Sequence, residues 1–422
     1  WTVVSTFPPY MGLIPKEVKS WSEKTSNVEV PAVPEAVASE VLPSVLPNET
    51  PTRKVSAPEA INFRPLGPRV VAIERIASTG EFRLLINGTA STVRGVHYYF
   101  GDLLKKPLPE REKILRRDLA IIREVGFTAV TGWEEEGFDE KFLKLASEYD
   151  MPVIVPISLE PSRTLPDGSS WLAKGDFLDP TVRSEIKQRI TQKLTIYKND
   201  PSVLSWNIGA DEPLERMSRH YKRPPEQVQA AADLIVELVM LAHEIDPAHP
   251  VIVSEPQDWY VGFYQVSLEK ARRTGIDPSQ FFIVGGNFYQ AGSVKTDLRR
   301  VKTAVTEKLN VAFAVMEWAP FGVNRTERPL FRSRMAKDVA EATPISIVYV
   351  FNPAIDPLNF MPDPTLAIVT GLSLTDQDRT DANGLLTAIA GTLGRPLFPT
   401  ALQILKADRE QGWSGIPVSR PI

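Results

Sequence analysis

The chain contains no cysteine, and only four of its 422 residues are histidine. The first absence excludes disulfides, thiolate metal ligands and a cysteine nucleophile. The histidines include no His-x-x-x-His pair, so the usual helical pattern of a zinc site is missing as well. We therefore expect no metal site.

The sequence also has little charge bias and no long apolar run. A net charge of −4 gives no electrostatic reason to expect a nucleic-acid partner. A membrane-spanning helix needs about 20 consecutive apolar residues, so we expect no transmembrane segment in this chain. Hydrophobic residues make up 43% and charged residues 24%, which is typical of a globular protein.

Two features bear on location. The chain starts at Trp1 rather than Met, which is compatible with a removed signal peptide or anchor. Three triplets match the glycosylation sequon: Asn48-Glu-Thr50, Asn87-Gly-Thr89 and Asn324-Arg-Thr326. We expect an extracytoplasmic protein, either secreted or held at the cell surface or in the periplasm.

Residues 1–68 contain eleven of the 37 prolines and have no sustained helical or strand period. This composition predicts a Pro-rich extended arm or linker. Apolar residues such as Trp1, Phe7 and Trp21 are too numerous for a purely solvated tether. We expect part of the arm to pack on the main domain or to bind a protein partner or another subunit.

Residues 69–92 are expected to form a short antiparallel β element. The apolar runs that start at Val70 and Phe82 are separated by turn residues, and Asn87-Gly88 is a strong hairpin turn signal. This element leads directly into the next region.

Residues 93–394 alternate short apolar strands with amphipathic helices. Ile186, Ile190 and Leu194 have the spacing of one buried helix face. Prolines stand at or near expected helix starts, where a missing N–H costs little: Pro180, Pro225 and Pro329. The strand candidates begin near Val93, Thr128, Val153, Val203, Val251, Phe282, Ala312 and Ile345.

Eight strand–helix alternations predict an α/β fold, a (β/α)8 TIM barrel. A doubly wound sheet is the competing interpretation, but no Gly-x-Gly-x-x-Gly or phosphate loop follows the first strand. After Phe351 the periodicity weakens. We expect a last helix over residues 381–393 and, over residues 395–422, a C-terminal tail packed on the barrel.

Two acidic residues end apolar strand candidates. Glu212, with its neighbour Asp211, follows the run from Val203, and Glu317 ends the run from Val311. In a barrel the carboxyl ends of the strands form the active face, so these carboxylates should meet at one cleft. A facing pair of carboxylates can act as proton donor and nucleophile in retaining glycosidic chemistry.

Other polar and aromatic residues are expected at the same face. Carboxylates and amides can hydrogen-bond sugar hydroxyls, and aromatic rings can stack on the apolar faces of pyranoses. The candidates for substrate contact are Arg94, His97, Trp133, Asn207, Asn287 and Trp318. Arg94 is equally compatible with an interior salt bridge, and His97 with a satisfied structural histidine. We interpret Glu134–Glu136 as a solvated loop, with the wall of a sugar subsite as the alternative, and leave Glu255 unassigned.

Several motifs resemble the retaining glycoside hydrolases of clan A, most of all the β-galactosidase/β-glucuronidase family and related β-glucan-acting enzymes. They span residues 82–355: Phe82–Gly88 with Arg94-Gly-Val96, Tyr197–Trp206, Asn287-Phe-Tyr289 and Glu317-Trp318. The resemblance implies an acid/base on strand four, a nucleophile at Glu317, and a hydrogen bond from Tyr289 to that nucleophile. It implies no organic cofactor.

Strand four departs from the family pattern. The family has Asn-Glu there, with the Asn on the sugar 2-hydroxyl, whereas this chain reads Trp206-Asn-Ile-Gly-Ala-Asp-Glu-Pro213. Either Asp211 or Glu212 takes the acid position. We favour Glu212, because Asp is a methylene shorter and the two carboxyls must lie about 5–5.5 Å apart for retention.

These observations support two hypotheses. The first is a retaining β-glycoside hydrolase or transglycosylase that acts on a β-linked oligo- or polysaccharide. The alternative is a catalytically inactive barrel, serving as a structural or carbohydrate-binding subunit of a larger extracytoplasmic assembly. The missing Asn and the long arm motivate the second.

Overall fold

The computed structural model describes residues 67–348, apart from residues 99, 125–126, 162, 164, 211, 291–293, 322–334, 336 and 340. The predicted arm up to residue 66, Pro329, the predicted last helix and the C-terminal tail lie outside the described residues. Among the described residues, no helix combines the length and apolarity needed to span a bilayer.

Eight parallel strands close into a barrel in the order β10-β11-β4-β5-β6-β7-β8-β9. Each begins within one residue of its predicted start, so the predicted TIM barrel is confirmed. The strands are β4 (Val93–His97), β5 (Ala129–Thr131), β6 (Val153–Ile157), β7 (Val203–Ile208), β8 (Val251–Glu255), β9 (Phe282–Gln290), β10 (Ala312–Phe321) and β11 (Ile345–Val348).

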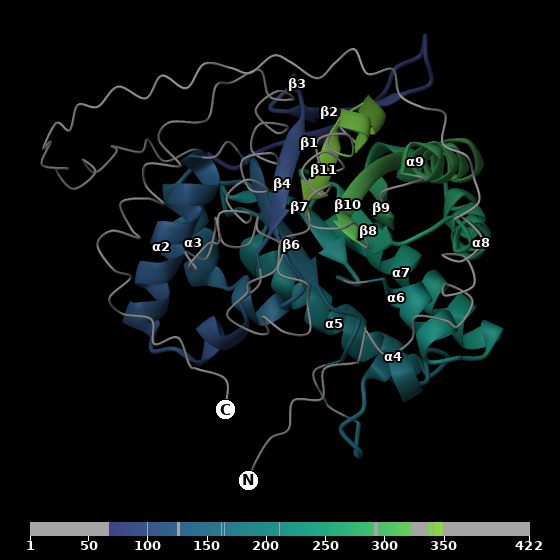
Figure 1. The fold of residues 1–422 in the computed structure, drawn as a ribbon. Coiled ribbons are helices and arrows are strands. Elements are labelled where there is room, and N and C mark those ends of the chain that lie inside the picture. Colours follow the sequence, from purple (N-terminus) through teal and green to yellow (C-terminus); the bar gives the residue numbers. More distant parts are fainter. Residues whose placement is uncertain are drawn as a thin grey trace, which may run out of the picture. The chain divides into compact units, whose positions relative to one another are not determined.

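Helices follow the strands and lie around them in Figure 1, with α2 and α3 on one side and α8 and α9 on the other. Pro180 and Pro225 begin α5 and α7 as predicted. The α-helices are α2 (Leu108–Glu124), α3 (Glu140–Glu148), α4 (Trp171–Lys174), α5 (Pro180–Tyr197), α6 (Pro213–Glu215), α7 (Pro225–Ile245), α8 (Val261–Arg272) and α9 (Val294–Thr303). Shorter or irregular helical segments are η2 (Gly101–Lys105), η3 (Glu135–Gly137), η4 (Arg216–His220), η5 (Pro278–Gln280) and η6 (Ala304–Leu309).

A separate three-stranded antiparallel sheet precedes the barrel: β1 (Val71–Arg75), β2 (Phe82–Ile86) and β3 (Thr89–Ser91). Asn87 and Gly88 join β2 to β3 with φ of 51° and 77°, the backbone that an Asn-Gly turn favours. This confirms the predicted β element. The N–H of Val71 donates to the carbonyl of Ala248, just before β8 begins, so the sheet meets the amino ends of the strands.

The barrel interior is filled by one apolar cluster to which the β1–β2 sheet contributes. Ile154, Leu204 and Ile252 point inward from three strands and belong to the same buried cluster as Val71 and Leu84. The strand residues between them point outward and pack against the helices in a larger cluster. This alternation is the one expected of barrel strands. Because the amino ends are covered, the opposite ends of the strands are left to form the site.

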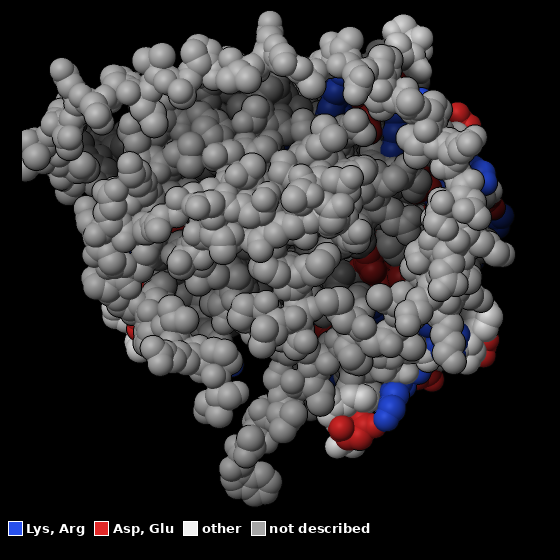
Figure 2. Space-filling view, in the orientation of Figure 1, with Lys and Arg blue, Asp and Glu red and all other residues white. Residues whose placement is uncertain are grey.

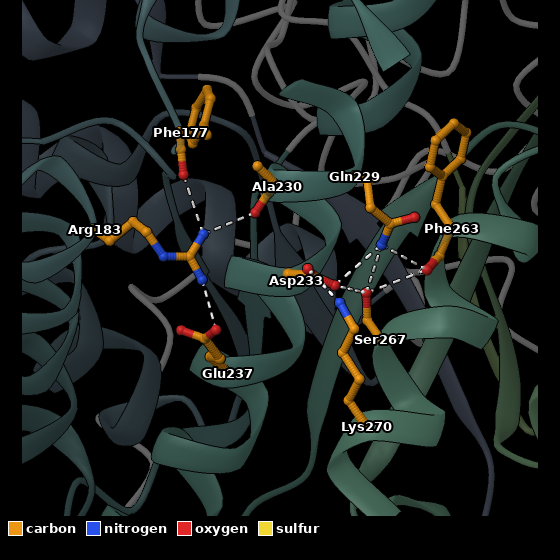
Figure 3. A network of polar contacts seen from close by, with 9 residues as sticks. All are labelled: Phe177, Arg183, Gln229, Ala230, Asp233, Glu237, Phe263, Ser267 and Lys270. Carbon is orange, nitrogen blue, oxygen red and sulfur yellow. Dashed lines mark hydrogen bonds and ion pairs between the residues drawn. The ribbon is translucent and has the colours of Figure 1, made fainter. Parts of the chain in front are cut away.

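Polar contacts join neighbouring helices on the outside of the barrel (Figure 3). Arg183 of α5 donates to the carbonyl of Ala230 and to Glu237, both on α7. Between α7 and α8, Asp233 of α7 accepts hydrogen bonds from Ser267 and Lys270 of α8. On the described surface in Figure 2, acidic and basic side chains are interspersed along the right-hand edge, in keeping with the small net charge.

Candidate active site

The carboxyl ends of the strands carry a cluster of polar side chains. The tight packing of apolar strand residues brings these ends together, although the residues are far apart in the sequence. The cluster contains His97 at the end of β4, Trp133 after β5, Glu212 after β7, Ser254 and Glu255 of β8, Asn287 of β9, and Glu317 of β10.

Glu317 is buried, with 3% of its surface exposed. Its Oε1 accepts a hydrogen bond of 2.5 Å from the indole Nε1 of Trp133. A hydrogen bond from a neutral donor to a carboxylate is stronger than one between neutral groups. This contact fixes the orientation of the Glu317 carboxylate inside the barrel mouth.

His97 lies beside the same carboxylate. Its Nε2 is 3.5 Å from Oε1 of Glu317 and 3.2 Å from the carbonyl of Met316, and its ring centroid is 4.5 Å from that of Trp133. Burial lowers the pKa of His97 to about 3, despite the contact with Met316. The imidazole is therefore neutral at physiological pH, and the Met316 carbonyl favours the tautomer that carries its proton on Nε2.

Glu212 is held from the other side of the cluster. Its Oε1 accepts a hydrogen bond of 2.6 Å from Nδ2 of Asn287. The Oδ1 of Asn287 accepts in turn from the hydroxyl of Ser254, at 3.0 Å. The serine bond fixes which way the amide faces, so that its NH2 group points at Glu212.

Asn287 also connects the two acidic residues. In the β9–β10 ladder, Asn287 is the register partner of Glu317, so their backbones are about one strand spacing, ~4.8 Å, apart. Register partners on adjacent strands point to the same face of a sheet. Glu212 and Glu317 therefore both approach Asn287 at one end of the barrel.

The turn that carries Glu212 has an unusual backbone. Gly209, Ala210 and Glu212 have φ of 92°, 55° and 42°. Asn207 stabilises the turn, because its Nδ2 donates to the carbonyl of Ala210 at 3.1 Å. Left-handed φ at non-glycine residues costs energy and is found at sites where the surroundings enforce it.

Glu255 is a member of the cluster that sequence reasoning left unassigned. Its carboxylate accepts from the backbone N–H groups of Leu214 and Glu215 at 3.0 and 3.2 Å, and from the hydroxyl of Tyr264 at 3.1 Å. Burial raises the pKa of Glu255 well above its usual value, and the charge of Glu212 adds to that effect. Its position as the last residue of β8 was the only signal in the sequence.

The other predicted site residues are distributed as follows. Asn207 is buried beside the Glu212 turn, and Trp318 is buried in β10. Tyr289 belongs to β9, but its side chain is not among those described, and Asp211 lies outside the described residues. Arg94 donates to the carbonyls of Val93, Thr343 and Pro344 at the amino ends of β4 and β11. These hydrogen bonds of Arg94 therefore lie at the end of the barrel opposite to the polar cluster.

The interpretation of Glu134–Glu136 as a solvated loop is wrong for two of its three residues. Glu134 accepts from the N–H of Phe100. Glu135 forms ion pairs with Arg189 and Lys193 at 2.7 and 3.1 Å, and only Glu136 is exposed. These contacts tie the segment to α5 and support the backbone that follows Trp133.

Within the described part of the chain, no group of three or more histidine or acidic residues is arranged to hold a metal ion. The cluster offers instead three carboxyl groups, an amide, a hydroxyl, an indole N–H and a neutral imidazole. Such a set can orient a polar ligand, donate a proton and supply a carboxylate nucleophile.

No family model and no curated protein sequence matches the chain. Solved structures do match. A GH2 β-galacturonidase from Eisenbergiella tayi has 16% identity and a TM-score of 0.47 over 67% of this chain and 46% of its own. An endo-1,4-β-mannanase from Rhizomucor miehei has 14% identity and a TM-score of 0.47 over 71% and 98%. A β-galactosidase from Marinomonas ef1 has 12% identity and a TM-score of 0.45 over 74% and 61%.

The chain spans 46% of the length of the β-galacturonidase. It spans 40% of the length of an FMN-binding β-glucuronidase, which is also among the matching structures. The likeness is distant. The case for a function therefore depends on the side chains at the carboxyl end of the barrel.

Proposed function

We propose that the protein is a retaining β-glycoside hydrolase or transglycosylase that acts on a β-linked oligo- or polysaccharide. One observation carries the proposal. Asn287 binds Glu212 through its amide and is the strand partner of Glu317, so the two carboxyl groups approach one point of the barrel mouth. A pair of carboxyl groups around one scissile bond is what double displacement requires.

In the first step, the Glu317 carboxylate attacks the anomeric carbon. A glycosyl ester forms as the bond to the leaving oxygen breaks, and Glu212 gives its proton to that oxygen. In the second step, the Glu212 carboxylate takes a proton from water or from an acceptor hydroxyl. The resulting oxygen nucleophile displaces Glu317, which leaves as a carboxylate with the anomeric configuration retained.

Neighbouring side chains have supporting roles in this proposal. Trp133 holds Glu317 through its N–H, and His97, whose pKa burial lowers to about 3, is a neutral neighbour of the nucleophile. Trp133, Trp318, His97, Asn207 and Asn287 are the proposed substrate contacts. Tyr289 is the proposed partner of the nucleophile by resemblance alone, and Arg94 is a structural residue.

The proposal can be tested with aryl β-glycosides of several sugars. Glu317→Gln should abolish turnover of every substrate. Glu212→Ala should abolish turnover of substrates with poor leaving groups, but should still form the glycosyl enzyme from dinitrophenyl glycosides, because a good leaving group needs no proton. Equal loss on both kinds of leaving group would contradict the acid role of Glu212.

The same comparison decides between Glu212 and Asp211. If Asp211 is the proton donor, Asp211→Asn rather than Glu212→Ala should show the selective loss with poor leaving groups. The proposal expects Asp211→Asn to slow both classes of substrate by similar factors.

A second candidate is a non-catalytic barrel that binds carbohydrate or has a structural role. The observation in its favour is that Glu317 is only 3% exposed, with Oε1 bound by Trp133. The absence of turnover by the unmodified protein across the panel, with retained binding of an oligosaccharide in calorimetry, would support this candidate over an enzyme.

A further inference from the structure

The backbone between β7 and α6 requires an external restraint. Ala210 and Glu212 both adopt left-handed φ, which costs about 1–2 kcal/mol for each non-glycine residue. Pro213 follows and has no N–H to donate. The first two donors after Glu212 are therefore the N–H groups of Leu214 and Glu215, in the short helix α6.

Both of these N–H groups donate to Glu255, one to each carboxylate oxygen. Glu255 is fully buried at the end of β8, and its strand is held in register with β9 up to the pair Glu255–Gly286. A rigid strand thus holds the far side of the Glu212 turn, while Asn207 holds the near side through the carbonyl of Ala210.

We propose that Glu255 is a positioning residue for the acid/base step, which holds the Glu212 turn so that the Glu212 carboxyl stays against Asn287. The inference rests on the proposed function. It goes further, because it assigns the acid step to a pair of acidic residues rather than to Glu212 alone.

The pair has an electrostatic consequence. Burial raises the pKa of Glu255 well above its usual value, and the negative charge of Glu212 raises it further. A second negative charge beside the first is disfavoured by repulsion, so the two carboxyl groups titrate as a coupled pair. The other titratable groups that interact with Glu255 are Tyr260 and Tyr264, and burial beside Glu255 raises the pKa of each well above its usual value.

The test compares Glu255→Gln with unmodified protein on good and poor leaving groups. Gln keeps the length of the side chain but presents an NH2 group to one backbone N–H. We expect kcat/KM to fall about 10- to 100-fold with poor leaving groups, a part of what general acid catalysis contributes. It should change less than about threefold with dinitrophenyl glycosides.

Tyr264→Phe is a milder second variant, which removes one hydrogen bond to Glu255 and keeps the aromatic packing. This variant should also lower kcat/KM selectively with poor leaving groups, but by a smaller factor than Glu255→Gln. Glu237→Gln, on the outer face of α7 (Figure 3), is the matched control and should leave all rates unchanged. Equal loss on both leaving groups in Glu255→Gln would overturn the inference.

A readout without substrate separates this inference from the proposed function. Because the folded-state pKa of Glu255 is raised, its contribution to stability is present below about pH 4.5, the usual pKa of a glutamate carboxyl, and is lost as pH rises through the folded-state pKa. The melting temperature of Glu255→Gln, measured relative to that of the unmodified protein, should therefore increase as the pH rises from 4 to 8. A constant difference would contradict the electrostatic role of Glu255, whether or not the protein hydrolyses a glycoside.

Discussion

At the scale of single residues, the hydrogen bond between Trp133 and Glu317 is the most direct constraint on the candidate nucleophile. Trp133→Phe removes the N–H donor and keeps an aromatic ring beside His97. A hydrogen bond to a charged group is worth about 1.5–3 kcal/mol, so we expect kcat/KM to fall about 10- to 100-fold. Steady-state kinetics on dinitrophenyl glycosides would measure this.

The melting temperature of Trp133→Phe serves as its control, because the indole is only half-buried and folding should be little affected. An unchanged rate would mean that the indole N–H does not orient the nucleophile.

Contacts between individual side chains of the site were the feature that the sequence predicted least well. Trp133 and Glu317 are 184 positions apart, and Glu255 is 41 positions from Leu214. Periodicity and turn signals describe neighbours along the chain, whereas these contacts arise only when the barrel closes. The sequence could therefore nominate Glu212, Glu317 and Trp133 from their strand-end positions and place the two carboxylates at one cleft, but could not predict the hydrogen bonds that hold them. It could not distinguish Glu255 from an ordinary strand-end acid.

At the scale of elements, the turn after β7 determines where Glu212 lies. Gly209 has φ of +92°, and a Cβ added there would lie 2.9 Å from Cγ of Pro213. Gly209→Ala should destabilise the fold by about 1–2 kcal/mol and should also lower kcat, because the turn must shift to relieve the clash. Urea unfolding and kinetics measure the two effects.

Gly168→Ala is the matched control for this change. Gly168 also has a left-handed φ, +71°, but an added Cβ would meet nothing within 4 Å. Its variant should show the stability loss without the loss of activity. If both variants keep full activity, the geometry of the β7 turn is not critical to catalysis.

The outer helices offer a pH-dependent prediction. Burial tends to raise the pKa of Asp233, but hydrogen bonds from Lys270, Ser267 and Gln229 outweigh it and lower the pKa. A lowered folded-state pKa gives stability that is present above about pH 3.8, the usual pKa of an aspartate carboxyl, and is lost as pH falls through the folded-state pKa. Asp233→Asn should cost about 1 kcal/mol at pH 7, where solvent screens part of the ion pair.

Urea unfolding at several pH values tests this expectation. The difference between Asp233→Asn and the unmodified protein should shrink as the pH falls below about 4. A difference that is constant with pH would show that the Asp233 charge does not stabilise the α7–α8 boundary.

Elements were the part of the structure that the sequence predicted best. All eight strand starts, the Asn87-Gly88 turn and the helix starts at Pro180 and Pro225 are found where the local pattern placed them. Buried parallel strands are short continuous apolar runs, and proline and glycine mark their boundaries, so the signal is local. The turn at Gly209 was not foreseen, because its conformation depends on Glu255 and Asn207 rather than on local preference.

At the scale of the whole molecule, the β1–β2 sheet completes the barrel core from its amino end. Leu84 is 2% exposed and belongs to the interior cluster, whereas Leu85 faces the other side and is half-buried. Leu84→Ala should lower the free energy of unfolding by about 2–5 kcal/mol, the usual cost of a core cavity. Leu85→Ala should cost much less. Equal costs would show that the sheet is not part of the barrel core.

The central claim for the molecule is that Glu317 forms a covalent bond with the substrate. A 2-deoxy-2-fluoro-β-glycosyl fluoride tests this directly: the 2-fluorine slows both steps, and the fluoride leaving group lets the intermediate accumulate. With the sugar that the protein turns over fastest, we expect mass spectrometry to find one added glycosyl group on the peptide that contains Glu317. Glu317→Gln should remain unmodified. An adduct on another residue, or none on a protein that turns over the parent glycoside, would contradict the account.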